Sequence, residues 1–161
     1  MENNNNAGMA EQTEVQLVAF KLHNEEYGVN IDFVQEIKRL TDITRVPFTS
    51  EFFKGVMNLR GSVLPVIDLK KRLGLQEAPY TDDTRIVIVR VDETSIGMIV
   101  DAVTEVLTID NDHIDTPKVI SDGSDSRSEG MKFVSGVGNL ENRLVIMLNL
   151  NEIIGSTGEV K

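Results

Sequence analysis

The sequence contains no cysteine and no tryptophan, and aromatic residues make up only 5% of its 161 residues. Without cysteine the chain can form no disulfide, thiolate metal site or cysteine nucleophile. With so few aromatics, its core must consist mainly of valine, isoleucine and leucine. Richness in β-branched residues favours strands over helices, so the composition predicts a β-rich protein.

Positive charge is also scarce, because 16 Lys and Arg stand against 26 Asp and Glu, a formal net charge of −10. No basic run extends beyond Lys70-Lys71-Arg72. Since contacts with phosphates need clustered Lys and Arg, a nucleic acid is not an expected partner. No apolar run has membrane-spanning length, and the Asn-rich start lacks the apolar stretch of a signal peptide. We therefore expect a soluble, cytoplasmic protein without direct membrane insertion.

The most informative feature is an internal repeat. Residues 28–37, G-V-N-I-D-F-V-Q-E-I, match 97–106, G-M-I-V-D-A-V-T-E-V, at an offset of 69 residues, and the match extends back so that 17–37 covers 86–106. Residues 55–69 match 136–150 at an offset of 81. Two matching segments in the same order indicate a tandem duplication of a unit of about 70 residues, which would bury too little surface alone.

This duplication predicts an all-β fold with a few short helices, in which each copy forms a small barrel or curled sheet and the two share a core. Barrel closure removes exposed strand edges. We expect a disordered tail over 1–14, one domain over 15–154 and a short polar tail over 155–161. The polar segment Asp122–Gly130 lies where the offset grows and is expected to be a loop. Strands are predicted at 15–22, 63–67, 85–91, 96–100 and 144–148, and short helices at 50–54, 69–73 and 150–154.

Several positions refine this outline. Pro65 suggests an edge strand or a bulge, because proline cannot donate a ladder hydrogen bond. Ser50 is expected to cap the first helix, and Gly74 and Gly155 to end the other two. In the repeat, Gly61 and Asn142 occupy the tips of matched hairpins, where tolerance of positive φ is useful.

No pattern of residues favours catalysis. Asp32 and Asp101 are matched by the repeat, as in pseudo-symmetric aspartic proteases, but the small polar residue and glycine that hold such a pair are missing. They are better interpreted as turn or backbone-capping residues. His23 and His113 are too few for a metal cluster and are interpreted as exposed turn residues. Neither a nucleophile elbow nor a phosphate-binding glycine loop is present.

Two groups are candidates for binding. Arg60 lies at a hairpin tip where the repeat has Glu141 instead, so the repeat explains Gly61 but not the arginine; a rigidly held guanidinium can make forked contacts with a partner. Apolar and acidic residues also alternate just after each matched aspartate, which is typical of an apolar patch with a charged rim. That group comprises Val34, Glu36, Ile37, Val103 and Val106.

The segments G-V-M-N-L-R-G-S-V-L-P-V-I-D-L and E-Y-G-V-N-I-D-F-V-Q-E-I closely resemble the bacterial chemotaxis coupling family, CheW, and the resemblance runs from about Val15 to Ile154. The resemblance implies two SH3-like β-barrels on a shared core. It also implies a non-enzymatic adaptor, active without a cofactor, that joins the regulatory domain of the histidine kinase CheA to the cytoplasmic tip of methyl-accepting chemoreceptors. Such a protein would be a monomer in isolation and would be recruited to receptor arrays.

Carried over by position, the resemblance implies a receptor-binding surface, while kinase-facing residues stay unassigned. Three interpretations stay open: a coupling protein for chemotaxis, a related coupling module for another sensory array, and an enzyme that uses the paired aspartates. The receptor-binding residues implied are Arg60, Gly55, Val34, Glu36, Val103 and Val106.

Overall fold

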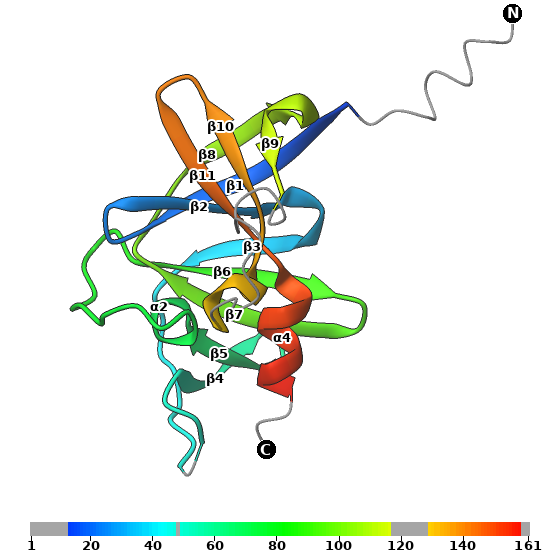
Figure 1. The fold of residues 1–161 in the computed structure, drawn as a ribbon. Helices are drawn as coiled ribbons and strands as arrows, with labels where there is room; N and C mark the ends of the chain where they lie inside the picture. Colours follow the sequence, from blue (N-terminus) through cyan, green and yellow to red (C-terminus); the bar gives the residue numbers. More distant parts are fainter. Residues whose placement is uncertain (1–12, 48, 117–128, 159–161) are drawn as a thin grey trace, which may run out of the picture.

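The computed structural model describes residues 13–47, 49–116 and 129–158, which form strands with a few short helical turns (Figure 1). The predicted tail lies outside the described residues except for its last two, and Glu14 already begins the first strand. Most of the predicted 122–130 loop also lies outside them. In chain order the elements are β1 (Glu14–Leu22), β2 (Glu25–Asn30), η1 (Ile31–Phe33), β3 (Val34–Arg39), β4 (Phe53–Leu59), β5 (Ser62–Asp68), α2 (Leu69–Arg72), β6 (Arg85–Val91), β7 (Thr94–Val100), β8 (Ala102–Asp110), η2 (Asn111–His113), β9 (Ile114–Asp115), η3 (Glu129–Phe133), β10 (Val134–Leu140), β11 (Arg143–Leu148) and α4 (Leu150–Gly158).

The strands form two sheets that exchange strands between the repeats. One sheet has the order β8-β1-β2-β11-β10-β9 and the other β3-β6-β7-β5-β4. Strands β1 and β2 of the first repeat therefore lie with β8 to β11 of the second, while β6 and β7 lie with β3 to β5. The expectation that each copy forms its own barrel is corrected: each sheet is built from both copies. The predicted fold class itself, two small β-units on a shared core with short helices, is confirmed.

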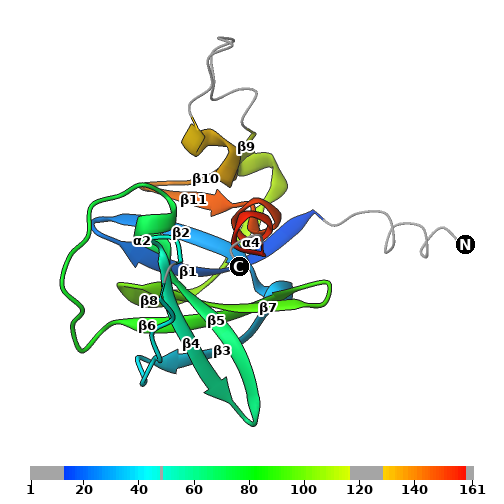
Figure 2. The ribbon, with the colours of Figure 1, turned by 90° about the horizontal axis from the view of Figure 1, so that it is seen from below.

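The shared core lies between the two sheets, which Figure 2 shows as two layers of strands with α4 beside their junction. Phe20 and Val18 of β1 enter it from one side, and Val87 and Val89 of β6 from the other. The residues between these point to the opposite face of each strand. Those of β1 enter a second core within the first sheet, and those of β6 enter a third core within the other sheet. Both strands are thus buried on both faces, which explains why their sequences are continuous apolar runs.

Three two-residue hairpin turns place a residue at positive φ. His23 (61°) and Asp92 (58°) occupy positions matched by the repeat, after β1 and after β6. Between β4 and β5, both Arg60 (51°) and Gly61 (89°) have positive φ, the signature of the type I′ turn that suits the twist of paired strands. The expected use of Asn142 in this way is not observed, because its φ is not positive.

The helices follow the predictions in part. Helix α2 ends where expected: Gly74 has a φ of 79°, and its N–H donates to the carbonyl of Lys71 at 3.0 Å. Two predictions are wrong. Residues 50–54 form no helix: a turn at 51–52 leads into β4, and the Phe53 N–H donates to the Ser50 carbonyl at 3.1 Å. Helix α4 continues through Gly155, which does not take a left-handed conformation and so does not end it.

Pro65 lies neither on an edge strand nor at a bulge. Strand β5 lies between β4 and β7, and its parallel pairing with β7 begins only at Val66. The proline therefore stands just before the residues that pair with β7, where its missing N–H costs no ladder hydrogen bond to that strand.

The matched aspartates have different environments. Asp101 lies between β7 and β8, where the chain passes from one sheet to the other, and its carboxylate accepts the His23 N–H at 2.7 Å and pairs with Lys70 Nζ at 2.7 Å. The Lys70 side chain is only 3% exposed. Asp32 lies at the corresponding crossover within η1, exposed, with its backbone N–H donating to Asn30 Oδ1 at 2.8 Å. One crossover is thus fastened by an ion pair between a half-buried aspartate and a buried lysine.

We predict that Asp101→Asn lowers the free energy of unfolding by about 3 kcal/mol, because it leaves the buried Lys70 ammonium without its counter-charge. Asp32→Asn, the matched control, should change it by no more than about 0.5 kcal/mol. Urea titration of both variants measures the difference. Equal effects at the two positions would contradict the assignment of Asp101 as the fastening residue.

Candidate functional site

The hairpin arginine contacts a strand from the opposite edge of its sheet. Arg60 donates from an Nη to Glu36 Oε1 on β3 at 2.8 Å, and Lys38 Nζ lies 3.9 Å from the other carboxylate oxygen. Strands β3 and β4 are the two edges of this sheet, so the pair bridges its open side. The Arg60 side chain is 71% exposed. One carboxylate cannot use all five N–H donors of a guanidinium, so this arginine can also bind a partner.

The three candidate valines flank the shared core. Val34 on β3 and Val103 on β8 are half-buried and pack against its margin, one from each sheet. Val106, opposite Val18 on β1, is 51% exposed. Its repeat counterpart on β3, Ile37, is 41% exposed. The structure therefore places apolar side chains on both free edge strands, β3 and β8, and joins Arg60 to Glu36 directly.

Gly55 is buried and has a structural role. Its φ is 144°, and a Cβ at this position would lie 2.1 Å from the backbone oxygen of Thr44. That close approach permits the bridge in which Thr44 and Val56 exchange backbone hydrogen bonds of 2.8 and 2.9 Å. Gly55 thus holds the segment after β3 against β4, and contributes no side chain to a binding surface.

The other sheet carries a corresponding ion-pair network. Arg143 on β11 donates to both Glu26 carboxylate oxygens at 2.9 Å and to Glu105 Oε2 on β8 at 2.7 Å. Thr104 Oγ1 donates to Glu26 at 2.9 Å. The hydrogen bonds from Arg143 hold the pKa of Glu26 below its usual range despite partial burial, and the two carboxylates raise the pKa of Arg143. Arg143 is therefore engaged by two carboxylates where Arg60 has one.

Sequence reasoning missed this network, although the repeat offered a signal for part of it. Glu105 is the counterpart of Glu36 at the offset of 69, so a charged partner on the facing hairpin was to be expected. Arg143, however, matches Ser62 at the offset of 81 and lies two residues after Glu141, the counterpart of Arg60. The repeat alone could not identify it.

The structure gives no support to a catalytic aspartate pair. Asp101 is engaged by Lys70 and His23, whereas Asp32 is exposed at the other crossover, so the two do not share a proton. His23 Nε2 donates to the Gln76 carbonyl at 2.6 Å, and His113 is exposed in η2. Over residues 13–47, 49–116 and 129–158, no group of three or more His, Asp or Glu could hold a metal ion. In the same ranges no helix is long and apolar enough to cross a membrane.

Comparison with known proteins gives a consistent result. The family model described as a CheW-like domain matches residues 16–158. A probable chemotaxis protein CheW of Rhizobium etli is 34% identical over 147 residues, covering 91% of each chain. The chemotaxis protein CheW of Bacillus subtilis is 33% identical over 144 residues, covering 89% of this chain and 88% of the relative.

Among solved structures, the scaffolding protein TtCheW from Thermoanaerobacter tengcongensis superimposes with a TM-score of 0.79 at 35% sequence identity. The match covers 91% of this chain and 99% of that one. The two sheets described above therefore correspond to the pair of SH3-like barrels that the resemblance implied.

We predict that Gly55→Ala lowers the free energy of unfolding by about 2 kcal/mol or more, because the new methyl group meets the Thr44 carbonyl and the φ is unfavourable for alanine. Gly155→Ala is the matched control. A methyl group added at Gly155 would have no atom within 4 Å, so this change within the helix should stabilise by up to about 1 kcal/mol. Thermal and urea unfolding compare the two. A neutral Gly55→Ala would contradict the structural role.

The Glu26 network predicts a pH dependence. Because the folded-state pKa of Glu26 is lowered, its contribution to stability is present above its unfolded pKa of about 4.3 and is lost as the pH falls through the folded value. Glu26→Gln should therefore cost about 1–2 kcal/mol at pH 7, and much less at pH 3. Urea titrations of both proteins at the two pH values measure this; a cost that stays constant would show that the ion pair does not cause it.

Proposed function

This chain belongs to the CheW-like family of chemotaxis proteins, and on that premise we propose that it is a non-enzymatic adaptor coupling chemoreceptors to the histidine kinase CheA. In this role it binds the kinase's regulatory domain and the cytoplasmic tips of methyl-accepting receptors, is cytoplasmic, and joins receptor arrays through these contacts. It carries out no reaction and needs no cofactor.

The observation that carries the proposal is the exposed Arg60–Glu36 pair on a rigid frame. Arg60 is fixed by a two-residue turn between paired strands, so its guanidinium is presented at a defined place. Its one carboxylate partner leaves donors for a receptor side chain or carbonyl. A preorganised donor of this kind loses little conformational entropy on binding.

The receptor-binding surface proposed here combines this pair with Val34, Val103 and Val106. Apolar side chains on β3 and β8 provide contact area, and the ion pair provides direction, in keeping with the usual apolar centre and polar rim of an interface. Gly55 supports the surface by holding the segment after β3 in place. Strands β3 and β8 belong to different sheets. The affinity of a receptor that contacts both strands therefore depends on how the two sheets are placed relative to each other.

Signalling through such an adaptor depends on differences in contact. A receptor can bias the kinase only by as much as its contacts with the adaptor differ between the kinase's two states. Glu36 offers a simple means, since it can stay with Arg60 or be released when a receptor group takes the arginine. The contact that Glu36 makes between edge strand β3 and the Arg60 hairpin would then loosen or tighten slightly.

We predict that Arg60→Ala weakens binding of a soluble receptor-tip fragment about tenfold, the effect of losing a charge-assisted hydrogen bond of about 1.5 kcal/mol. Binding of the kinase regulatory domain should be unchanged. Calorimetric titration with each partner measures both. Arg90→Ala removes another exposed arginine, whose Nε donates to the Asp92 carbonyl, and serves as the matched control.

A charge-swapped double variant, Arg60→Glu with Glu36→Arg, separates the two functions of the pair. It keeps an ion pair across the sheet and should keep the melting temperature, yet it presents the opposite charge at the turn. We expect receptor binding to stay weak in this variant. Full recovery of binding would show that Arg60 acts only by closing the sheet, and failure of the wild type to bind either partner would refute the adaptor role.

A further inference from the structure

The two repeats have equivalent frameworks around the start of α2 and the start of α4. In the first, β5 pairs with β7 in parallel, with Val66 opposite Gly97. In the second, β11 pairs with β2 in parallel, with Met147 opposite Gly28. Met147 is the counterpart of Val66 at the offset of 81, and Gly28 that of Gly97 at 69. The surroundings of these two pairings can therefore be compared residue by residue.

In the first repeat, the space beside the parallel pairing and the start of α2 is filled by a tyrosine from the segment between the repeats. Tyr80 packs against the core formed by β4 to β7, its hydroxyl donates to Asp68 Oδ2 at 3.0 Å, and Lys54 Nζ lies 5.5 Å from its ring centroid. Burial, followed by the nearby Asp68 charge, raises the pKa of the Tyr80 hydroxyl well above its usual range. The segment that ends with this tyrosine, residues 75–80, forms no helix or strand.

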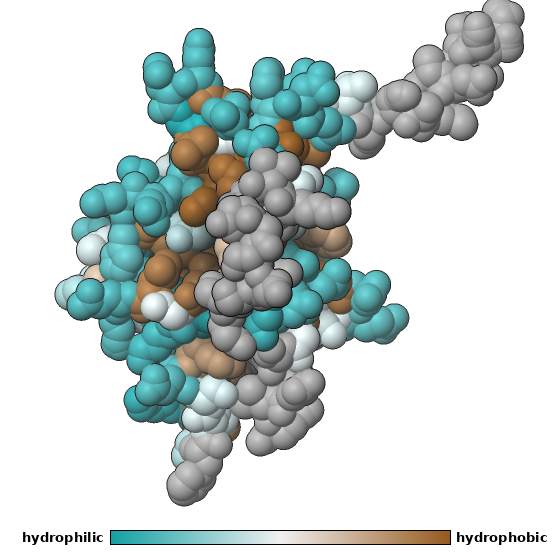
Figure 3. All heavy atoms as spheres, viewed as in Figure 1, coloured by the Kyte–Doolittle hydropathy of each residue, from teal (hydrophilic) through white to brown (hydrophobic). Residues whose placement is uncertain are grey.

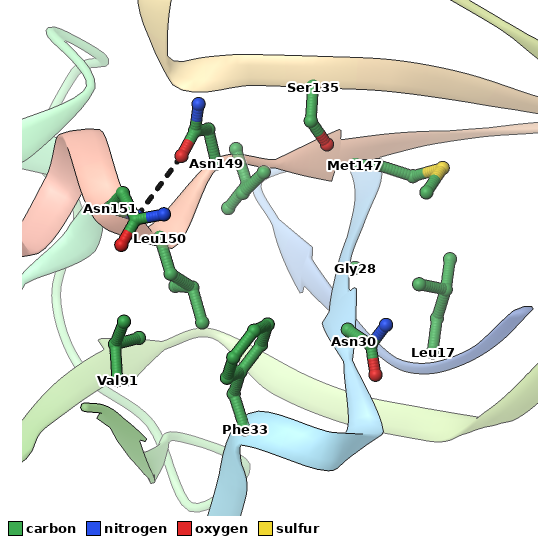
Figure 4. A pocket seen from close by; sticks show the side chains of 11 residues that line it. Leu17, Gly28, Asn30, Phe33, Val91, Ser135, Met147, Asn149, Leu150 and Asn151 are labelled. Carbon is green, nitrogen blue, oxygen red and sulfur yellow. Dashed lines mark hydrogen bonds between the residues drawn. The ribbon is translucent and has the colours of Figure 1, made fainter.

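In the second repeat, the corresponding place is a cavity of about 290 Å³ (Figure 4). Asn149, the counterpart of Asp68, and Ser135, the counterpart of Lys54, both line it. The chain has two tyrosines, and neither is available: Tyr27 is buried beside Phe20, and Tyr80 fills the first repeat. The other described residues of the lining are Leu17, Gly28, Asn30, Phe33, Val91, Met147, Leu148, Leu150 and Asn151.

The lining selects for an uncharged side chain with an apolar body and a polar tip. Among the residues that the structure describes, the lining contains no Lys, Arg, His, Asp or Glu, so a charged occupant would lose its hydration without gaining a counter-charge from them. Figure 4 shows Phe33, Leu150 and Val91 at one end and the amide of Asn149 at the other. The Asn149 Oδ1 accepts from the Asn151 N–H at 3.0 Å, and its amide group retains donors. Tyrosine fits this arrangement.

We propose that this cavity binds a tyrosine presented by an extended segment of a partner protein, in the way that Tyr80 occupies the first repeat. The segment lies across β11 and the start of α4 with its ring over Met147 and Leu150 and its hydroxyl on the Asn149 amide. The described lining shares no residue with the proposed receptor-binding surface, so the existence of this site does not depend on the adaptor role. In Figure 3, hydrophobic residues reach the surface to the left of the middle of the view, among hydrophilic residues.

The probe is a peptide of the chain's own residues 74–81, Gly-Leu-Gln-Glu-Ala-Pro-Tyr-Thr, titrated into the isotope-labelled full chain and followed by amide chemical shifts. We expect shifts at Ser135, Asn149 and Asn151. A peptide with phenylalanine for tyrosine should bind about fivefold more weakly through loss of one hydrogen bond, and one with alanine should not bind. Shifts confined to Lys54 and Asp68 would mean that the peptide only displaces Tyr80, and would overturn the proposal.

Two variants sharpen the test. Asn149→Asp recreates the carboxylate of the first repeat and keeps a good helix cap, so it should tighten binding about threefold to tenfold. Asn139→Asp, an exposed position on β10 outside the cavity lining, is the control for the added charge. Ser135→Trp should fill the cavity and abolish binding while the melting curve confirms folding. Equal binding of the peptide by all these proteins would overturn the proposal. It would also be overturned if light scattering showed that the shifts come from dimerisation of the chain.

Discussion

The architecture depends on the packing of β1 against β6 through the shared core. Each strand sends alternate residues into the shared core and the others into its own sheet's core, so neither has a face left for solvent. Burial on both faces constrains the side chains of these two central strands, whereas the outer strands have faces or edges that can differ. Strands β3 and β8 then pair on one side only, β3 with β6 and β8 with β1. The free edges that carry the candidate surface are thus a direct result of the central packing.

Strand exchange makes the two repeats interdependent. Because β3 completes the sheet of β6 and β8 completes that of β1, neither copy contains a full sheet. The chain must cross between sheets at residue 32 and again at residue 101, and at the second crossover a buried lysine holds the carboxylate. A displacement of β8 relative to β3 therefore moves one sheet relative to the other across the shared core, unless the edge strands separate from their sheets. This coupling suits a protein that transmits a bias between partners by geometry alone.

Much of this could be predicted from sequence, and the failures have physical causes. The apolar runs within 17–22 and 86–91 identified the central strands, and the two repeat offsets identified the duplication. The exchange of strands could not be predicted, because a repeat shows which segments are equivalent and says nothing of which copy each one pairs with. Arg60 and Glu36 were both named as candidates, but their contact could not be predicted, because they lie 24 residues apart and on opposite edges of a sheet. The resemblance implied that Gly55 is a receptor-binding residue, and the motif could not show its structural reason, which is the close approach of Thr44.

The duplication has left two similar frames with different chemistry, and two of the differences fall where we propose that partners bind. At the sheet openings, Arg143 is held by two carboxylates, while Arg60 has one and stays exposed. At the crossovers, Asp101 is fastened to a buried lysine and Asp32 is exposed. Beside the short helices, Asp68 holds Tyr80, whereas Asn149 faces a cavity. In each pair one copy satisfies its polar groups internally, and because burial of unsatisfied groups is costly, that copy gains stability. The other copy keeps groups that a partner can satisfy, so on our proposal stability and binding are divided between corresponding regions of the two repeats.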